Sequence, residues 1–267
     1  MNTRFDKPAK KHLGQNFLHD RGVIDRILLA IDPKPGEHIV EIGPGQGALT
    51  LPLLAEHGTL TAIEFDRDLL LPLAHAAEAQ GGTLRLIPRD VLQVDFSALA
   101  RELGGDGGRI RLVGNLPYNL SSPILFHALD HADAIIDMHF MLQKEVVERM
   151  AASEGSKVYG RLSVMLQAYC RVMPLLNVPP GAFRPAPKVD SAVVRLVPRP
   201  AQEIAVRDPA RFAAIVRAAF GQRRKTLHNA LRDLCDDAQI RSTGLEPGLR
   251  AEQVPVTGFI ALANVEG

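Results

Sequence analysis

The chain of 267 residues has no tryptophan and only two cysteines. Cys170 and Cys235 stand far apart and form no Cys-x-x-Cys motif, which argues against a disulfide framework and against a thiolate metal centre. We expect both to be reduced thiols, as is usual in the cytosol. No uninterrupted apolar run approaches the roughly 20 residues of a membrane-spanning helix, and residues 1–11 are polar with no apolar segment behind them. We therefore expect a soluble cytoplasmic protein without a membrane partner.

An excess of charge is also absent, because 31 Lys and Arg are balanced by 30 Asp and Glu to a net charge of +1. A nucleic acid would therefore have to bind at a local basic patch. Metal-ligand patterns are sparse too. His127 and His131 have the i,i+4 spacing of zinc ligands on a helix, but no third ligand clusters with them and the HExxH glutamate is missing. We predict no metal.

Strand patterns that alternate with helical ones dominate most of the chain. Short apolar runs typical of buried strands occupy residues 38–42, 60–65, 84–87, 110–113 and 137–142. Their alternation with helical patterns predicts an α/β fold with a Rossmann-like, doubly wound sheet. Two more strands are expected at 175–178 and 190–196. The second alternates apolar and polar residues, so we place it half exposed or at an edge.

A proline-rich segment at residues 198–200 marks a boundary. No strand pattern recurs beyond it, and Asp208 followed by Pro209 is typical of a helix start. We predict a cofactor-binding domain with an N-terminal arm over residues 1–198 and a small helical domain over residues 199–267.

A glycine-rich turn, residues 43–47, follows the first strand and precedes a helical pattern from about residue 48 to 57. Such a turn lets the backbone approach a ligand at a helix N-terminus. Gly43, Gly45 and Ala48 satisfy the GxGxxA pattern of nicotinamide-binding proteins. Gly43, Gly45 and Gly47 satisfy the GxGxG pattern usual for S-adenosylmethionine enzymes. The glycines alone leave both cofactors open.

Acidic residues stand at the ends of the second and third strands. Glu64 lies 21 residues after Gly43, the separation at which an acid binds ribose hydroxyls. Helix capping is the alternative for this segment, and Asp66 is expected to cap the helix that follows. Asp90 can accept a hydrogen bond from the exocyclic amine of a cofactor adenine, with Val91 against the ring, although such an acid is often only part of a turn.

The segment Asn115-Leu116-Pro117-Tyr118 follows the fourth strand. It offers an amide oxygen, a backbone carbonyl held in place by proline and an aromatic face, which together suit an amino group on a flat ring. A plain strand-to-helix turn is the alternative. Phe183 lies in the stiff, proline-rich loop 179–188, where it either plugs the core or faces Tyr118 across a pocket.

A local basic segment lies in the C-terminal domain. Between residues 211 and 232 there are six Lys or Arg and no acid. A solvated surface is the ordinary explanation of a charged run, but the complete lack of acids favours phosphate contact. The residues expected to bind RNA are Arg217, Arg223, Arg224 and Lys225.

Taken in this order, the glycine turn, the two acids and the Asn-Leu-Pro-Tyr segment resemble the ribosomal RNA adenine dimethyltransferase family, and most closely its bacterial small-subunit (16S) branch, the kasugamycin-sensitivity methyltransferases. Further blocks that carry the resemblance are residues 14–18, 139–146, 159–164, 183–196 and 220–227. Together they cover nearly the whole chain.

The resemblance implies roles for single residues. Asn16 and Leu18 of the arm would close over S-adenosylmethionine, Gly43 would pack near its amino-acid end, Glu64 would bind the ribose and Asp90 the adenine. Gly45, in the same turn as Gly43, and Val91, beside Asp90, belong to the same cofactor site. Asn115 would stand between cofactor and target.

The implied reaction is the transfer of two methyl groups to N6 of each of two adjacent adenines in a loop near the 3′ end of 16S rRNA, by a monomeric enzyme of small-subunit biogenesis. Asn115 and the Leu116 carbonyl would accept the two N6–H groups, and Tyr118 with Phe183 would hold the unstacked base. The small residues Gly114, Ser121 and Ser122 are expected to leave room for a methyl group.

Four alternatives stay open. A methyltransferase acting on large-subunit rRNA shares several motifs, but the blocks at 188–194 and 222–225 favour the small-subunit branch. A DNA adenine methyltransferase would use similar chemistry and lacks the other blocks. A subunit-assembly checkpoint factor would need binding more than catalysis. A nicotinamide oxidoreductase is the remaining interpretation of the glycine turn.

Overall fold

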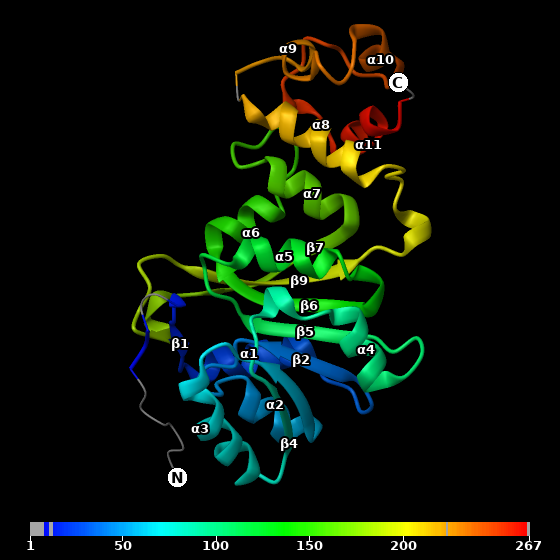
Figure 1. Cartoon of the computed structure of the whole chain (residues 1–267). Coiled ribbons are helices and arrows are strands. Elements are labelled where there is room, and N and C mark those ends of the chain that lie inside the picture. The colour runs from blue at the N-terminus through cyan, green and yellow to red at the C-terminus, as the bar shows by residue number, and fades with distance from the viewer. Residues whose placement is uncertain (1–7, 11–12, 223, 266–267) are drawn as a thin grey trace. The chain divides into compact units, whose positions relative to one another are not determined.

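The structure is a computed structural model that describes residues 8–10, 13–222 and 224–265 (Figure 1). Contacts divide the chain into two compact units, Met1–Lys144 with Pro174–Pro198 and Glu145–Met173 with Arg199–Gly267. We call these the first and the second unit. Residues 145–173, expected in the first domain, are thus grouped with the C-terminal helices. A division of function at residue 198 stays a prediction.

A seven-stranded sheet with the order β4-β3-β2-β5-β6-β9-β7 belongs to the first unit, except for residues 170–173 of β7, which are grouped with the second (Figure 1). Its strands are β2 (His38–Ile42), β3 (Thr59–Ile63), β4 (Thr83–Ile87), β5 (Ile110–Asn115), β6 (Ile135–Gln143), β7 (Cys170–Val178) and β9 (Ser191–Pro198). β2 pairs in parallel with β3 and β5, β3 with β4, and β5 with β6, whereas β9 runs antiparallel to β6. The predicted doubly wound α/β fold is confirmed, and the strand order reverses between β2 and β5.

Helices accompany these strands, and α4, between β4 and β5, is one that the sequence analysis did not predict. They are α1 (Arg21–Ile31), α2 (Thr50–His57), α3 (Arg67–Glu78), α4 (Phe96–Gly104) and α5 (Ser121–Leu129). Asp20, Asp66 and Asp95 start α1, α3 and α4, because each carboxylate accepts a backbone N–H of the first turn. The predicted cap at Asp66 is confirmed.

Close packing of β2 against β5 depends on Gly114. A Cβ atom at this position would lie 2.4 Å from the Ile42 carbonyl oxygen, so any other residue would push the two strands apart. The neighbouring Val40, Leu112 and Val113 are fully buried, as expected for central strands of a parallel sheet. Gly114 therefore sets the position of Asn115, the next residue in β5.

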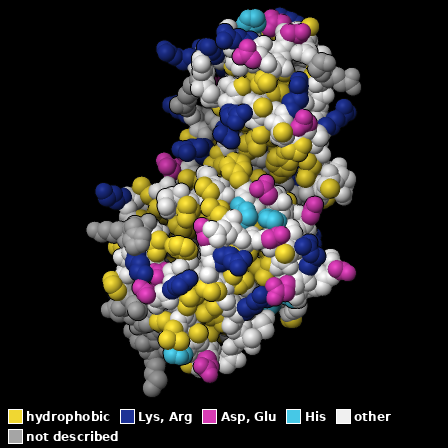
Figure 2. Space-filling view, in the orientation of Figure 1, with side chains coloured by type: hydrophobic (Ala, Val, Ile, Leu, Met, Phe, Trp, Pro, Cys, Tyr) yellow, Lys and Arg dark blue, Asp and Glu magenta, His cyan; other side chains and the backbone are white. Residues whose placement is uncertain are grey.

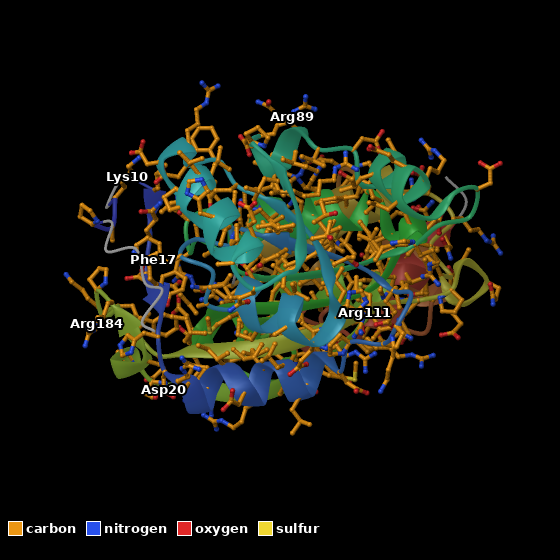
Figure 3. The ribbon with its side chains drawn as sticks, turned by 90° about the horizontal axis from the view of Figure 1, so that it is seen from below. Lys10, Phe17, Asp20, Arg89, Arg111 and Arg184 are labelled. Atoms are coloured by element: carbon orange, nitrogen blue, oxygen red, sulfur yellow. The ribbon has the colours of Figure 1, made fainter. Side chains whose placement is uncertain are left out.

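A buried ionic cluster holds the other end of β5. Arg111 donates through Nε to Asp137 Oδ1 (2.8 Å) and through Nη2 to the carbonyl of Ile31 (2.7 Å), the last residue of α1. Burial alone would raise the pKa of Asp137, but its hydrogen bonds to Arg111 and Arg195 hold that pKa below its ordinary value. The cluster ties the end of α1 to the amino end of β5, and the labelled Arg111 lies away from the arm residues Lys10 and Phe17 in Figure 3.

The expectation that residues 190–196 form an edge strand is wrong. β9 lies between β6 and β7, and its consecutive residues Ala192, Val193 and Val194 are all buried. The polar alternation has another cause, since Arg195 donates through Nε to the buried Asp137 Oδ2 at 3.0 Å. An ion pair thus accounts for the alternation that suggested exposure.

The second unit is helical. Its helices are α6 (Lys144–Met150), α7 (Arg161–Tyr169), α8 (Pro209–Gly221), α9 (Leu227–Leu231), α10 (Asp237–Ser242) and α11 (Val256–Asn264). The ring of Tyr159, just before α7, lies 6.0 Å from that of Phe220, which lies 5.4 Å from that of Phe259. Tyr159 Oη also donates to the Val254 carbonyl at 2.9 Å. These contacts explain why residues 145–173 group with this unit.

Cys170 and Cys235 are free and buried. Among the residues that the structure describes, no helix has the length and apolar character needed to cross a membrane.

Candidate active site

A cavity of about 240 Å³ lies where β2, β3, β4 and β5 end. It is lined by the residues that follow these strands, among them Gly43, Gly45, Glu64, Phe65, residues 89–91 and residues 115–120, together with residues 13–17 of the N-terminal segment. The crevice at the carboxyl ends of the strands, beside the point where the strand order reverses, is where doubly wound folds bind ligands.

The glycine turn after β2 has a backbone that requires glycine. Gly43, Gly45 and Gly47 have φ angles of +67°, +56° and +79°, in the left-handed region. A Cβ atom at Gly45 would lie 3.2 Å from the ring of Phe17. The turn therefore combines an unusual conformation with close packing under the N-terminal segment.

Glu64 follows β3 and is 7% exposed. Its Oε2 accepts the N–H of Gly45 (3.2 Å) and its Oε1 accepts the N–H of Asp66 (2.7 Å). Burial raises the pKa of Glu64, and these two backbone donors partly oppose the rise. The carboxylate is thus held rigidly at the cavity wall, with lone pairs left to accept hydroxyl groups of a ligand.

Asp90 and Val91 follow β4. Asp90 Oδ1 accepts the N–H of Leu92 at 3.0 Å and so starts the short turn Val91–Gln93. No described residue donates to the other carboxylate oxygen of Asp90. Val91 is 8% exposed and lines the same cavity. An open acceptor beside an apolar surface suits a flat ring that carries an amino group.

Asn115 ends β5 with its carboxamide held from one side. Its Nδ2 donates to the backbone carbonyl of Asn16 at 3.0 Å, and its Oδ1 accepts no hydrogen bond from a described residue. The N–H of Leu116 donates to the Met141 carbonyl (3.1 Å), whereas the Leu116 carbonyl accepts no hydrogen bond from a described residue. Two acceptors therefore stand next to each other in the chain without a donor.

Tyr118 also lines the cavity, and its hydroxyl is anchored. Tyr118 Oη lies 2.7 Å from Ser191 Oγ, and burial raises the pKa of the phenol, so the hydroxyl stays neutral. The Pro117 carbonyl accepts the N–H of Leu120 (3.0 Å) and the hydroxyl of Ser121 (3.2 Å). Two hydrogen bonds to the Pro117 carbonyl thus stabilise the turn into α5, and the hydroxyl end of the Tyr118 ring is held by Ser191.

The N-terminal segment before α1 forms an arm beside the cavity. Its strand β1 (Phe17–Leu18) pairs antiparallel with β8 (Phe183–Arg184), and the labelled Phe17 and Arg184 lie along the same edge as Lys10 in Figure 3. A second cavity, of about 580 Å³, is lined by parts of the arm, α1 and α2.

A polar cluster, which we call the arm latch, holds the arm against the start of α3. Lys10 Nζ contacts Asp66 Oδ1 (2.6 Å) and Asp68 Oδ2 (2.7 Å), and Gln15 Nε2 donates to Asp66 Oδ2 (2.9 Å). Burial alone would raise the pKa of Asp66, but the hydrogen bonds from Lys10 and Gln15 lower it. The latch reaches Glu64 as well, because Glu64 accepts the N–H of Asp66.

Most of the predicted site residues line the first cavity, namely Asn16, Gly43, Gly45, Glu64, Asp90, Val91, Asn115, Leu116, Pro117 and Tyr118. Leu18 and Phe183 do not. They are 6% and 2% exposed and belong to one apolar core cluster. They are direct partners in the β1–β8 pairing, and such partners project to the same face, here into the core. Phe183 is thus a core plug in this structure, and its role toward a base stays a prediction.

The room expected for a methyl group is not found at Gly114, Ser121 and Ser122. Gly114 faces the Ile42 carbonyl, Ser121 Oγ donates to the Pro117 carbonyl, and Ser122 is exposed. Close strand packing explains Gly114, and the hydrogen bond to the Pro117 carbonyl explains Ser121.

The basic segment lies in the second unit, where Lys and Arg side chains are prominent in Figure 2. Arg217, Arg224 and Lys225 are exposed, and no described residue forms an ion pair with them. Arg223 lies outside the described residues. Exposed cations without acidic partners retain their charge for a polyanion.

Sequence reasoning missed the arm latch, Phe17 and Ser191. Gln15, Phe17 and Ser191 lie inside blocks that carry the family resemblance, which was the available signal. No sequence signal indicated a role for Lys10, because its partner Asp66 is 56 residues away in the chain.

A family model described as ribosomal RNA adenine dimethylase matches residues 7–265. Curated relatives named ribosomal RNA small subunit methyltransferase A are 67% identical in Xanthomonas campestris pv. campestris (strain B100) and Xanthomonas axonopodis pv. citri (strain 306). Each alignment spans 266 residues, which is 100% of this chain and 99% of the relative.

Two solved structures are similar in fold. A dimethyladenosine transferase from Plasmodium falciparum has a TM-score of 0.77 over 92% of this chain and 95% of its own, and the 23S rRNA methyltransferase ErmE has 0.71 over 93% and 98%. Both are 24% identical to this chain, so the likeness establishes the methyltransferase fold alone.

Proposed function

The chain belongs to the ribosomal RNA adenine dimethylase family, an S-adenosylmethionine-dependent group of enzymes, and we propose that it dimethylates N6 of two adjacent adenines in a 3′-terminal hairpin loop of 16S rRNA. The observation that carries this proposal is a pair of acceptors, Asn115 Oδ1 and the Leu116 carbonyl, that have no donor among the described residues and lie beside a cavity whose lining suits an adenosine cofactor. We place the reaction in the cytoplasm, in small-subunit biogenesis.

The residues of the cavity fit S-adenosylmethionine. Glu64 would accept the ribose hydroxyls, the open oxygen of Asp90 would accept the adenine amine, and Val91 would contact the ring face. Gly43 and Gly45, which have positive φ angles and no side chain, would let the amino-acid end of S-adenosylmethionine approach the backbone of the turn. Asn16 in the arm would close the site, and Leu18 would support the arm from the core. When bound, the cofactor supplies an electrophilic methyl group on a sulfonium centre.

Asn115 and Leu116 would prepare the target nitrogen. The lone pair of adenine N6 is delocalised into the ring and is a poor nucleophile. If Asn115 Oδ1 and the Leu116 carbonyl each accept one N6–H, they draw the nitrogen toward tetrahedral geometry and free its lone pair. The same two acceptors stabilise the positive charge that develops during attack. Pro117 fixes the Leu116 carbonyl, and water takes the proton, so no general base is assigned.

Tyr118 would stack on the unstacked base. Stacking on an aromatic side chain is worth roughly 1–3 kcal/mol per base, enough to offset part of the cost of unstacking. Phe183 would join as the second ring only after its side chain leaves the core cluster. Since β8 is paired with β1, we propose that a shift of the arm accompanies RNA binding.

The RNA would be held by the second unit through Arg217, Arg224 and Lys225, with Arg223 in the same run. We propose a monomer that uses no metal.

Mass spectrometry of nucleosides tests the proposal. Small subunits that lack the modification, incubated with the protein and S-adenosylmethionine, should yield N6-dimethyladenosine, whereas large subunits should not. Absence of the product from small subunits, or its appearance in large subunits, would overturn the substrate assignment.

A further inference from the structure

We propose that Ser191 is a positioning residue for the target base, because its hydroxyl holds the Tyr118 ring in the orientation that stacks. The inference rests on the proposed function and names a residue that does not line the cavity. Three features of the structure support it, which are the geometry of the hydroxyl pair, the rigidity of Ser191 and the loop position of Tyr118.

The hydroxyl pair is short, and its Ser191 side is fully buried. Tyr118 Oη and Ser191 Oγ are 2.7 Å apart, and Ser191 is 0% exposed. Since the Tyr118 phenol remains neutral, each hydroxyl can act as donor or acceptor. Ser191 is closed off from water, so removal of the Tyr118 hydroxyl leaves the Ser191 hydroxyl without this hydrogen bond.

Ser191 is a rigid support. It is the first residue of β9 and pairs with Gln143 at the end of β6. The preceding residue is fixed as well, because the Asp190 carbonyl accepts the N–H of Lys144 at 2.9 Å. The hydroxyl of Ser191 is therefore anchored to the central sheet.

Tyr118, by contrast, lies in the turn between β5 and α5, and its ring reaches the cavity. An aromatic side chain on a turn can rotate about two torsions unless its far end is held. The bond to Ser191 holds that end, so the ring face is presented before the base arrives. Loss of this preorganisation should weaken the interaction with RNA and leave the affinity for the cofactor unchanged.

A double-mutant cycle tests the inference. Ser191→Ala and Tyr118→Phe each remove one hydroxyl and keep the ring. Each should lower kcat/KM for RNA by about 3- to 10-fold, the size of one intramolecular hydrogen bond. The double variant should lose no more than either single variant, and Kd for S-adenosylmethionine should stay unchanged. Ser153→Ala, an exposed serine in the second unit, is the matched control.

A spectroscopic readout separates positioning from mere support of the fold. RNA with 2-aminopurine at the target position should show quenched emission on the wild-type protein and brighter emission on either variant, and the lack of tryptophan keeps the protein background low. Additive losses, or a lower melting temperature with unchanged RNA kinetics and emission, would overturn the role of Ser191. If wild-type protein itself neither binds nor methylates the RNA, the proposed function fails instead.

Discussion

Asn115 is held through the amide nitrogen of its side chain. Its Nδ2 is engaged by the Asn16 carbonyl, so the carboxamide presents one defined atom, Oδ1, to a ligand. The position of Asn115 in turn depends on Gly114, whose missing side chain lets β5 approach β2. A single functional atom is thus placed by a backbone carbonyl of the arm and by a close strand contact.

Asn115→Ala should lower the rate of methyl transfer by at least roughly 100-fold, since it removes a preorganised acceptor of the transition state. Binding of S-adenosylmethionine should change much less, because Glu64 and Asp90 remain. Single-turnover transfer and calorimetric cofactor binding measure the two effects. Asn177→Ala, an exposed asparagine on β7, is the control. Full turnover by Asn115→Ala would remove the acceptor model.

A second prediction concerns Glu41, which is 2% exposed beneath the glycine turn and accepts the Thr50 hydroxyl at 2.6 Å. Burial raises the pKa of Glu41 from 4.5 to about 8. Between these pH values the folded protein keeps a proton that the unfolded chain has lost, so stability should fall as pH rises, by up to about 1.4 kcal/mol per pH unit.

Glu41→Gln has no proton to lose and should remove this slope. Urea unfolding of the cofactor-free protein across that pH range should show the variant gaining stability over wild type as pH rises. Glu56→Gln, on the exposed face of α2, is the matched control. Parallel pH profiles for wild type and Glu41→Gln would show that Glu41 is ionised in the folded state.

At the scale of elements, the arm joins two sides of the first unit. It pairs with β8 through β1, reaches α3 through the arm latch, and touches β5 through the Asn16 carbonyl. The latch residue Asp66 also donates its N–H to Glu64, the proposed ribose ligand. Arm position and cofactor binding are therefore expected to be coupled.

Lys10→Met should weaken S-adenosylmethionine binding about two- to fivefold, the range for partly exposed ion pairs, and the loss should shrink at high salt. The methionine keeps the apolar stem and removes the contacts to Asp66 and Asp68. Kd measured at two ionic strengths tests both statements. Lys34→Met, which removes an exposed pair with Asp32 in the turn that precedes β2, should leave Kd unchanged. Equal Kd values for Lys10→Met and wild type would refute the coupling.

At the scale of the whole molecule, the proposed tasks are divided between the two units. The acceptors, the cavity and the arm belong to the first unit, and the exposed cations Arg217, Arg224 and Lys225 belong to the second. The net charge of +1 gives no general attraction for RNA, so these local cations should carry a large share of the salt-dependent affinity.

Replacement of Arg217, Arg224 and Lys225 by alanine should weaken RNA binding. It should also make the plot of the logarithm of the binding constant against the logarithm of the salt concentration less steep, by about one unit of slope for each phosphate that is no longer neutralised. Kd for S-adenosylmethionine should not change. A control that swaps Arg224 to Lys and Lys225 to Arg keeps the charge and should keep the slope. An unchanged slope in the alanine variant would place the RNA elsewhere.

The sequence by itself determined most of the order of strands and helices, the glycine turn, the acids after β3 and β4 and the Asn-Leu-Pro-Tyr segment. These features depend on local patterns. Apolar runs make strands, and glycine permits left-handed φ angles. The residue after a parallel strand lies at the carboxyl end of that strand, where doubly wound sheets bind ligands. Glu64, Asp90 and Asn115 line the cavity, as their places at the carboxyl ends of parallel strands predict. Asn16 lines it as the family resemblance implies.

Only the tertiary structure decided the features that depend on partners distant in the chain. β9 lies between β6 and β7, with Arg195 paired to the buried Asp137, and Phe183 is buried beside Leu18, its partner in β1. The latch between Lys10 and Asp66 and the bond between Tyr118 and Ser191 join residues 56 and 73 positions apart. Such contacts leave no periodic signal in the sequence, because packing alone brings their atoms together.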